Sequence, residues 1–183
     1  RLAHFASRKA MDIEMFSEKT AQSLCDKLGI QSIPQLYELE AAPLVALDGF
    51  GEKKTAKLLD ELEKSKSRPL SAFLFALGIP NVGSKTARDL ADVFGSLENV
   101  RAATEEKLVA IPDVGGIVAK SILDFFADPS ISEQLDRLIS LGVAPAKTEK
   151  TTEGPLAGKT VVLTGSLTNY TRSQAEDMVR VLG

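Results

Sequence analysis

The stretch Ile79-Pro-Asn-Val-Gly83 decides the fold of this chain, because its pattern recurs three more times. Each copy begins with an aliphatic residue and has Phe or Val in the position before last. Aligned on their last residues, the copies are spaced 34, 32 and 32 residues apart. A fixed period of this length indicates a supersecondary unit that is repeated along the chain. The four copies are Ile13–Ser17, Leu47–Gly51, Ile79–Gly83 and Ile111–Gly115.

The residues that follow each copy repeat as well. A small residue comes four places after the last turn residue, and an apolar residue comes seven places after it. This spacing predicts two short helices joined by a hairpin, whose aliphatic pair is buried and whose small residue lets the second helix pack closely. Glycine, Asn81 or Asp113 in the turn allows a left-handed backbone. The small residues are Ala21, Thr55, Ala87 and Ala119, and the apolar ones are Leu24, Leu58, Leu90 and Ile122.

The rest of the chain divides by composition. Residues 1–142 are typical of a series of short helices, whereas residues 143–154 contain almost no large apolar side chain and are expected to form a linker. Residues 155–183 contain one expected strand, Lys159–Thr164, and one expected helix over 171–182. Because so short an α/β segment rarely folds alone, we expect it to be the truncated start of a second domain. The predicted fold class is mainly α, with four tandem hairpins followed by this segment.

The end of each hairpin is suited to binding phosphate. It coincides with the start of a helix, where backbone N–H groups lack partners and the helix dipole is positive. Lysine follows two places later in three copies, as Lys19, Lys53 and Lys85. Contacts of this kind reach the sugar-phosphate backbone of DNA and carry no sequence information. The alternative, ordinary helix caps with solvated charges, is less attractive for four copies in register. The expected DNA-binding residues are Gly49, Gly51, Lys53, Lys54, Asn81, Gly83, Lys85, Arg88, Gly115, Gly116 and Lys120.

Composition limits how such binding could work. The 183 residues include 22 Lys and Arg against 25 Asp and Glu, a net charge of −3, so any grip on DNA must rely on positioned amides and a few local lysines. With no Trp and two Tyr, the chain lacks an obvious platform for stacking unpaired bases, which favours duplex DNA. A single cysteine excludes a disulfide scaffold, and no apolar run is long enough for a membrane span. We therefore expect an intracellular protein, and the sequence gives no sign of an oligomer.

These residues resemble the tandem helix-hairpin-helix region of bacterial NAD-dependent DNA ligases. Leu2–Glu14 is similar to the segment that follows the zinc finger of those enzymes, and Arg68–Gly83 is close to their hairpin region. Pro155–Gly165 resembles the first strand of the BRCT domain that ends them, and 171–182 its first helix. The resemblance implies a helix-hairpin-helix DNA-binding domain over 1–142 and the N-terminal part of a BRCT domain, truncated, over 155–183.

The resemblance also implies a function. The parent enzyme would seal nicks in double-stranded DNA during replication and repair, in the bacterial cytoplasm near the nucleoid. NAD, magnesium and zinc are implied for the full-length enzyme, and no cofactor, metal site or catalytic residue is expected in this fragment, whose partners would be nicked duplex DNA and the upstream catalytic domains. Ala46 stands where the nucleophilic lysine of a Lys-x-Asp-Gly motif would precede Asp48-Gly49. Cys25 and His4 alone cannot build a four-cysteine zinc site and are interpreted as packed helix residues.

Two hairpins depart from the family pattern. Met15 and Ser17 replace glycines in the first, so we expect that hairpin to be structural, and Ile117 replaces the lysine after the fourth. The residues by themselves do not exclude two other functions. One is a helix-hairpin-helix module of an excision nuclease or junction-binding protein. The other is a helical protein-interaction repeat, since tetratricopeptide and ankyrin repeats have a similar period.

Overall fold

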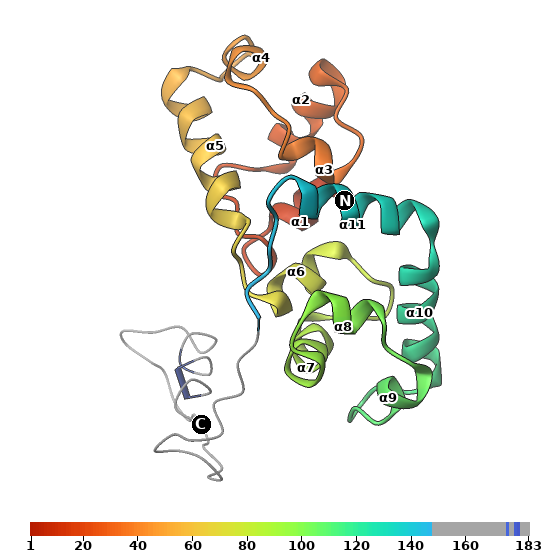
Figure 1. Ribbon diagram of the computed structural model, residues 1–183. Helices are drawn as coiled ribbons and strands as arrows, with labels where there is room; N and C mark the ends of the chain where they lie inside the picture. The colour runs from red at the N-terminus through yellow and green to blue at the C-terminus, as the bar shows by residue number, and fades with distance from the viewer. Residues whose placement is uncertain (148–174, 176–177, 180–183) are drawn as a thin grey trace. The chain divides into compact units, whose positions relative to one another are not determined.

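The structure is a computed structural model that describes residues 1–147, 175 and 178–179. The chain divides into two compact units, Arg1–Thr148 and Glu149–Gly183. The described part of the first unit contains eleven helices (Figure 1). They are α1 (Leu2–Ala6), α2 (Glu18–Leu28), α3 (Ile33–Leu36), α4 (Ala41–Val45), α5 (Glu52–Ser65), α6 (Leu70–Leu77), α7 (Ser84–Phe94), α8 (Leu97–Arg101), α9 (Glu105–Val109), α10 (Gly116–Ala127) and α11 (Pro129–Ser140).

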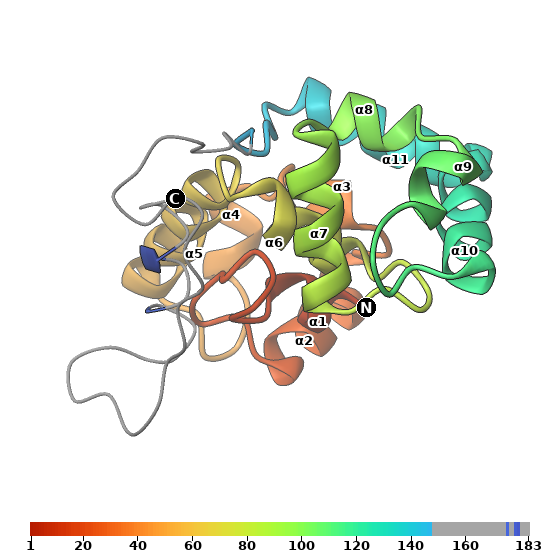
Figure 2. The ribbon, with the colours of Figure 1, turned by 90° about the horizontal axis from the view of Figure 1, so that it is seen from below.

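The helices confirm the predicted mainly α fold with four hairpins. The turns join α1 to α2, α4 to α5, α6 to α7 and α9 to α10, with a longer connection before the first turn. The short helices α3 and α8 connect the hairpins in pairs, so α1–α5 form one half of the unit and α6–α10 the other. Figures 1 and 2 place the second hairpin, between α4 and α5, and the fourth, between α9 and α10, at opposite ends of this unit.

The repeated positions build the core. The aliphatic and penultimate turn residues and the residues four and seven places after each turn are all buried, none more than 9% exposed. Leu24, Leu90 and Ile122 are fully buried at the last of these positions. Burying an apolar side chain of this size contributes about 1.5–3 kcal/mol. The hairpin prediction therefore identified the buried face of every second helix correctly.

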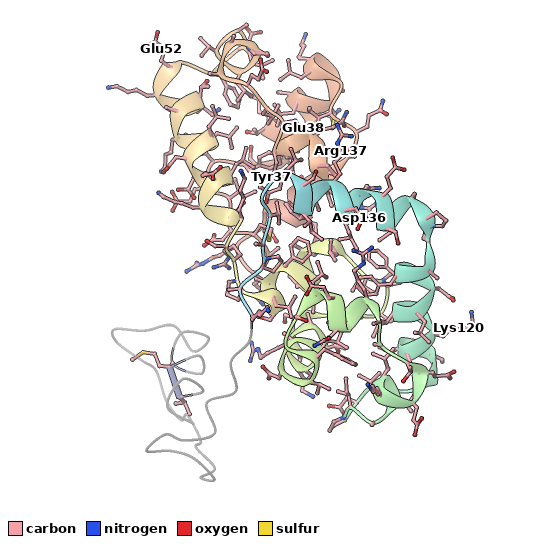
Figure 3. All side chains as sticks on the ribbon, in the orientation of Figure 1. Tyr37, Glu38, Glu52, Lys120, Asp136 and Arg137 are labelled. Carbon is pink, nitrogen blue, oxygen red and sulfur yellow. The ribbon has the colours of Figure 1, made fainter. Side chains whose placement is uncertain are left out.

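Contacts between the halves hold them together. Helix α1 packs against α6, and α11 packs against both α10 and α3. The His4 imidazole donates through Nε2 to the carbonyl oxygen of Phe75 at 2.9 Å, which links α1 to α6. Figure 3 shows Arg137 of α11 beside Glu38, and the guanidinium reaches both carboxylate oxygens at 2.6 Å. Planar pairs of this kind fix geometry as well as adding energy.

The first unit extends past residue 142, where the linker was expected to begin. Val143 is 1% exposed, and the Ala144 N–H donates to the Lys66 carbonyl oxygen at 2.9 Å. Ala146 forms a parallel bridge with Pro69 and accepts from the Leu70 N–H at 3.1 Å. The apolar side chain of Val143 explains the difference, because it fills the core between segments distant in sequence.

The remaining expectations for the C-terminal residues lie mostly outside the described part of the chain. The linker beyond residue 147 and the strand Lys159–Thr164 are not described. Of the helix expected over 171–182, Ala175, Met178 and Val179 are described, all in helical conformation. Among the described residues, no helix is both long and apolar enough to cross a membrane.

Candidate nucleic-acid interface

All four turns share one backbone conformation. The third turn residue is left-handed in each, with φ of 66° at Met15, 76° at Gly49, 63° at Asn81 and 67° at Asp113. This confirms the left-handed turn predicted for glycine, Asn81 and Asp113. The same conformation at Met15 was not expected, since a long side chain disfavours it. The first turn thus keeps the geometry of the repeat in spite of its residue change.

The last residue of each turn begins the helix that follows. Ser17, Gly51, Gly83 and Gly115 have extended backbones and occupy the N-cap position of α2, α5, α7 and α10. The carbonyl oxygen of each accepts from the N–H four residues later, at 2.9–3.0 Å. The four turns therefore present the first N–H groups of their helices in the same way.

The first hairpin differs from the others at this point. The Ser17 hydroxyl accepts from the Thr20 N–H at 3.2 Å and so occupies one of the free donors of α2. Gly51, Gly83 and Gly115 supply no such cap, and the first N–H groups of α5, α7 and α10 remain available. This difference supports a structural role for the first hairpin.

Packing inside the protein does not explain the glycines at these helix starts. A Cβ atom built on Gly51, Gly83, Gly115 or Gly116 would meet no atom within 4 Å. Gly49 differs, because its φ of 76° is strained for other residues. Open space next to unoccupied N–H groups is the arrangement that lets an anion approach the backbone.

The lysines expected to bind DNA have different surroundings. Lys53 is exposed on α5 and has no polar partner within the described residues. Lys54, next to it, turns back onto its own hairpin: its Nζ lies 4.0 Å from the centre of the Phe50 ring and donates to the Gly49 carbonyl oxygen at 3.3 Å. Lys85 on α7 contacts the carboxylate of Asp113. Lys53 is therefore the most available of the three ammonium groups.

The other two expected cations lie one turn further along their helices. Arg88 is half-buried on α7. Lys120, labelled in Figure 3, is exposed on α10. Its ammonium lies 2.8 Å from the carboxylate of Asp124 on the same helix. The hydrogen bond that the Lys120 ammonium donates to the Asp124 carboxylate raises the pKa of Lys120. Ile117, which takes the place of the lysine, is 79% exposed.

The structure brings the third and fourth hairpins together, a feature that the repeat pattern did not predict. The Asn81 side-chain amide donates to the Ser121 hydroxyl of α10 at 2.8 Å, and Lys85 pairs with Asp113. The Asn81 and Asp113 side chains thus reach across to the helix of the other hairpin. The opposite charges of Lys85 and Asp113 are visible in the sequence, but nothing within one repeat indicates that they meet.

A related ion pair joins the first two hairpins. The Glu14 carboxylate in the first turn lies 2.8 Å from the Lys57 ammonium on α5. The hydrogen bond with Lys57 lowers the pKa of Glu14 and raises that of Lys57. In both pairs of hairpins, an acid in one turn therefore binds a lysine on the helix after the other turn.

Thr55 holds the one buried side-chain oxygen or nitrogen without a hydrogen-bond partner in the described part of the chain. Its side chain occupies the position that is alanine in the other three hairpins. We expect Thr55→Val to raise the free energy of unfolding by about 1 kcal/mol, because a methyl group replaces an unpaired buried hydroxyl of the same shape. Urea denaturation would measure the change.

Thr20→Val is the matched control for Thr55→Val. The Thr20 side chain is also buried, but its hydroxyl donates to the Met15 carbonyl oxygen at 3.3 Å. We expect this variant to lose about 1 kcal/mol. Equal losses in the two variants would show that the Thr55 hydroxyl has a partner.

The described residues do not fit the zinc site implied for the full-length enzyme. Cys25 is the single cysteine of the chain and lies half-buried on α2, against the core. The His4 ring is engaged with Phe75. No group of three or more His, Cys, Asp or Glu side chains within the described ranges could hold a metal ion. A tetrahedral site needs four such ligands.

Comparisons with known proteins agree with this geometry. A helix-hairpin-helix motif matches residues 72–135, and a SAM-like helix-hairpin-helix tandem matches residues 12–64. The chain is 50%, 49% and 51% identical, over its whole length, to proteins named DNA ligase from Clostridium botulinum, Alkaliphilus metalliredigens and Clostridium perfringens. It spans 28% of the length of each. The resemblance is thereby confirmed: the first unit matches two helix-hairpin-helix models, and the whole chain is similar to one region of proteins named DNA ligase.

Proposed function

We propose that the hairpins bind the backbone of duplex DNA, without reading sequence, as part of a DNA ligase that seals nicks. The observation that carries this proposal is the repetition of one geometry: three helix starts with open N–H groups, glycines not required by packing, and cations in the next turns. Each helix start favours an anion through its dipole and its unpaired donors. Three such helix starts in one unit would each bind one phosphate of the DNA backbone.

The role of these contacts in the parent enzyme is positioning. By holding the duplex beside a nick, the hairpins would keep the reacting ends near the upstream catalytic domains, which converts a diffusional encounter into an oriented one. We propose that this parent enzyme depends on NAD, as the family resemblance implies, with magnesium and zinc bound outside this chain. We expect the nucleophilic lysine to lie outside this chain, since Ala46 stands where it would precede Asp48-Gly49.

Three further points concern residues 155–183, the location of the protein and the alternative functions. We propose that residues 155–183 begin a BRCT domain and that the protein works in the bacterial cytoplasm, near the nucleoid. The ligase relatives match the chain over its whole length, which favours the ligase over the excision-nuclease module or a protein-interaction repeat.

A salt titration of the 183-residue chain tests the proposal. We expect binding to nicked and to intact duplex with similar affinity, because backbone contacts do not require a nick, and weaker binding to single strands. Three helix starts that each contact one phosphate predict that log K falls against log salt with a slope of about −3. Fluorescence anisotropy with labelled DNA would measure both. Absent or salt-independent binding at low ionic strength would contradict DNA binding by this chain.

A further inference from the structure

We propose that Asp113 restrains DNA binding by the third hairpin, because its carboxylate holds the Lys85 ammonium that would otherwise contact a phosphate. The inference rests on the proposed function and names a residue that lowers affinity rather than one that supplies it. The fourth turn would then have two roles: it presents the start of α10, and its Asp113 limits the contact of Lys85 with DNA.

The geometry places Asp113 in competition with DNA. Lys85 lies in the first turn of α7, two residues after Gly83, where a phosphate bound to the open helix start would be within its reach. The Asp113 carboxylate reaches this ammonium from the fourth turn, and Asp89 on α7 lies 3.9 Å from it. A phosphate that contacts Lys85 must therefore displace the Asp113 carboxylate, and it must come close to the negative charges of both Asp113 and Asp89.

The pair is exchangeable. The Lys85 side chain is 69% exposed and that of Asp113 is 75% exposed, and ion pairs between such exposed groups contribute little stability. Lys85 lowers the pKa of Asp113 through a hydrogen bond and its charge, so the carboxylate is ionised at neutral pH. The contact does not lock Lys85, but it keeps a negative charge beside the expected phosphate position.

The backbone of the turn does not require that charge. Asn81 occupies the equivalent position of the third turn with φ 63°, close to the 67° of Asp113. Asparagine tolerates this left-handed conformation as well as aspartate does, since either short polar side chain can hydrogen-bond locally. The first pair of hairpins has a similar ion pair, between Glu14 and Lys57. Neutralising Asp113 should therefore leave the fold intact.

Asp113→Asn in the full chain tests the inference. We expect it to tighten binding to a nicked duplex about three- to tenfold at low salt, since one repulsive charge and one competing ion pair are removed. The slope of log K against log salt should steepen by about one, the value for one added phosphate contact. Anisotropy titrations at several salt concentrations give both quantities, and an unchanged thermal midpoint would show that the turn is preserved.

A double-mutant cycle separates this mechanism from a general charge effect. In a Lys85→Gln background, Asp113→Asn should improve affinity no more than Asp136→Asn does. Asp136 is a matched control because it is also exposed, pairs with Arg101 at 2.8 Å, and lies on α11 away from the turns (Figure 3). No gain in Asp113→Asn, or the same gain with and without Lys85, would overturn the inference while leaving DNA binding standing. Failure of the unaltered chain to bind at all would overturn the proposed function and the inference together.

Discussion

Replacing both Lys53 and Lys85 with glutamate should weaken binding to a nicked duplex about 100-fold at low salt. Each lysine lies two residues after a glycine that begins a helix with open N–H groups. Lys53→Glu removes one phosphate contact, and both reversals place a negative charge beside a helix start that is expected to bind phosphate. A loss of about tenfold per site corresponds to about 1.4 kcal/mol. The salt slope should fall by about one for Lys53→Glu and by less for Lys85→Glu, because Asp113 already holds the Lys85 ammonium. Anisotropy titrations of single and double variants would measure these effects, and we expect Lys53 to matter at least as much as Lys85 because it has no competing carboxylate among the described residues.

The matched control reverses the same amount of charge elsewhere. Lys27 and Lys64 lie in the last turns of α2 and α5, at the helix ends away from the hairpin turns. Lys27→Glu with Lys64→Glu should weaken binding only severalfold, through the change in net charge. If this control lost as much affinity as the variant at Lys53 and Lys85, binding would depend on net charge and not on the hairpins.

Leu90→Ala should lower the free energy of unfolding of the first unit by about 3 kcal/mol. Leu90 lies on α7 seven residues after its turn, is fully buried, and belongs to the core of this unit. Truncating a buried leucine removes its transfer free energy and leaves a cavity, which together cost about 2–5 kcal/mol. For a unit of this size the thermal midpoint should fall by about 6–12 °C. Urea or thermal denaturation followed by circular dichroism would measure the loss.

Val93→Ala is the control on the same helix. Val93 is 51% exposed, so removing its methyl groups should cost less than about 0.5 kcal/mol. Comparing Leu90→Ala with Val93→Ala tests whether the repeat predicts which residues are buried. The equivalent residues of the other hairpins are Leu24, Leu58 and Ile122. Similar small losses at Leu90 and Val93 would contradict the buried position that the repeat assigns to Leu90.

The sequence was sufficient for the parts of the fold that depend on local spacing. The repeated turns, three of which end in glycine and the first in Ser17, predicted four hairpins. Burial at positions such as Ile79, Ala87 and Leu90 follows from the helical period after each turn. The left-handed residue of the turn was predictable because glycine, asparagine and aspartate are the residues that tolerate it. The helix starts at Gly51, Gly83 and Gly115 followed from the same pattern.

Contacts between distant segments could not be predicted in this way. The pairing of Lys85 with Asp113 joins two repeats, and no periodic signal within one repeat specifies which charges meet. The left-handed Met15 was missed because its side chain disfavours that conformation, and the surrounding turn imposes it. Val143 was assigned to a linker because the residues around it are polar and small, although its own side chain is buried.

The segment Val143–Ala146 also determines how mechanical load would enter this unit. It lies beside Lys66–Leu70, the stretch that links α5 of the first half to α6 of the second. Traction on the chain beyond Ala146 is therefore borne first by the hydrogen bonds to Lys66, Arg68 and Leu70, and not by any hairpin. The joint between the halves therefore yields first, so that a pull from the following residues would separate Val143–Ala146 from Lys66–Leu70 before it disturbed any hairpin turn.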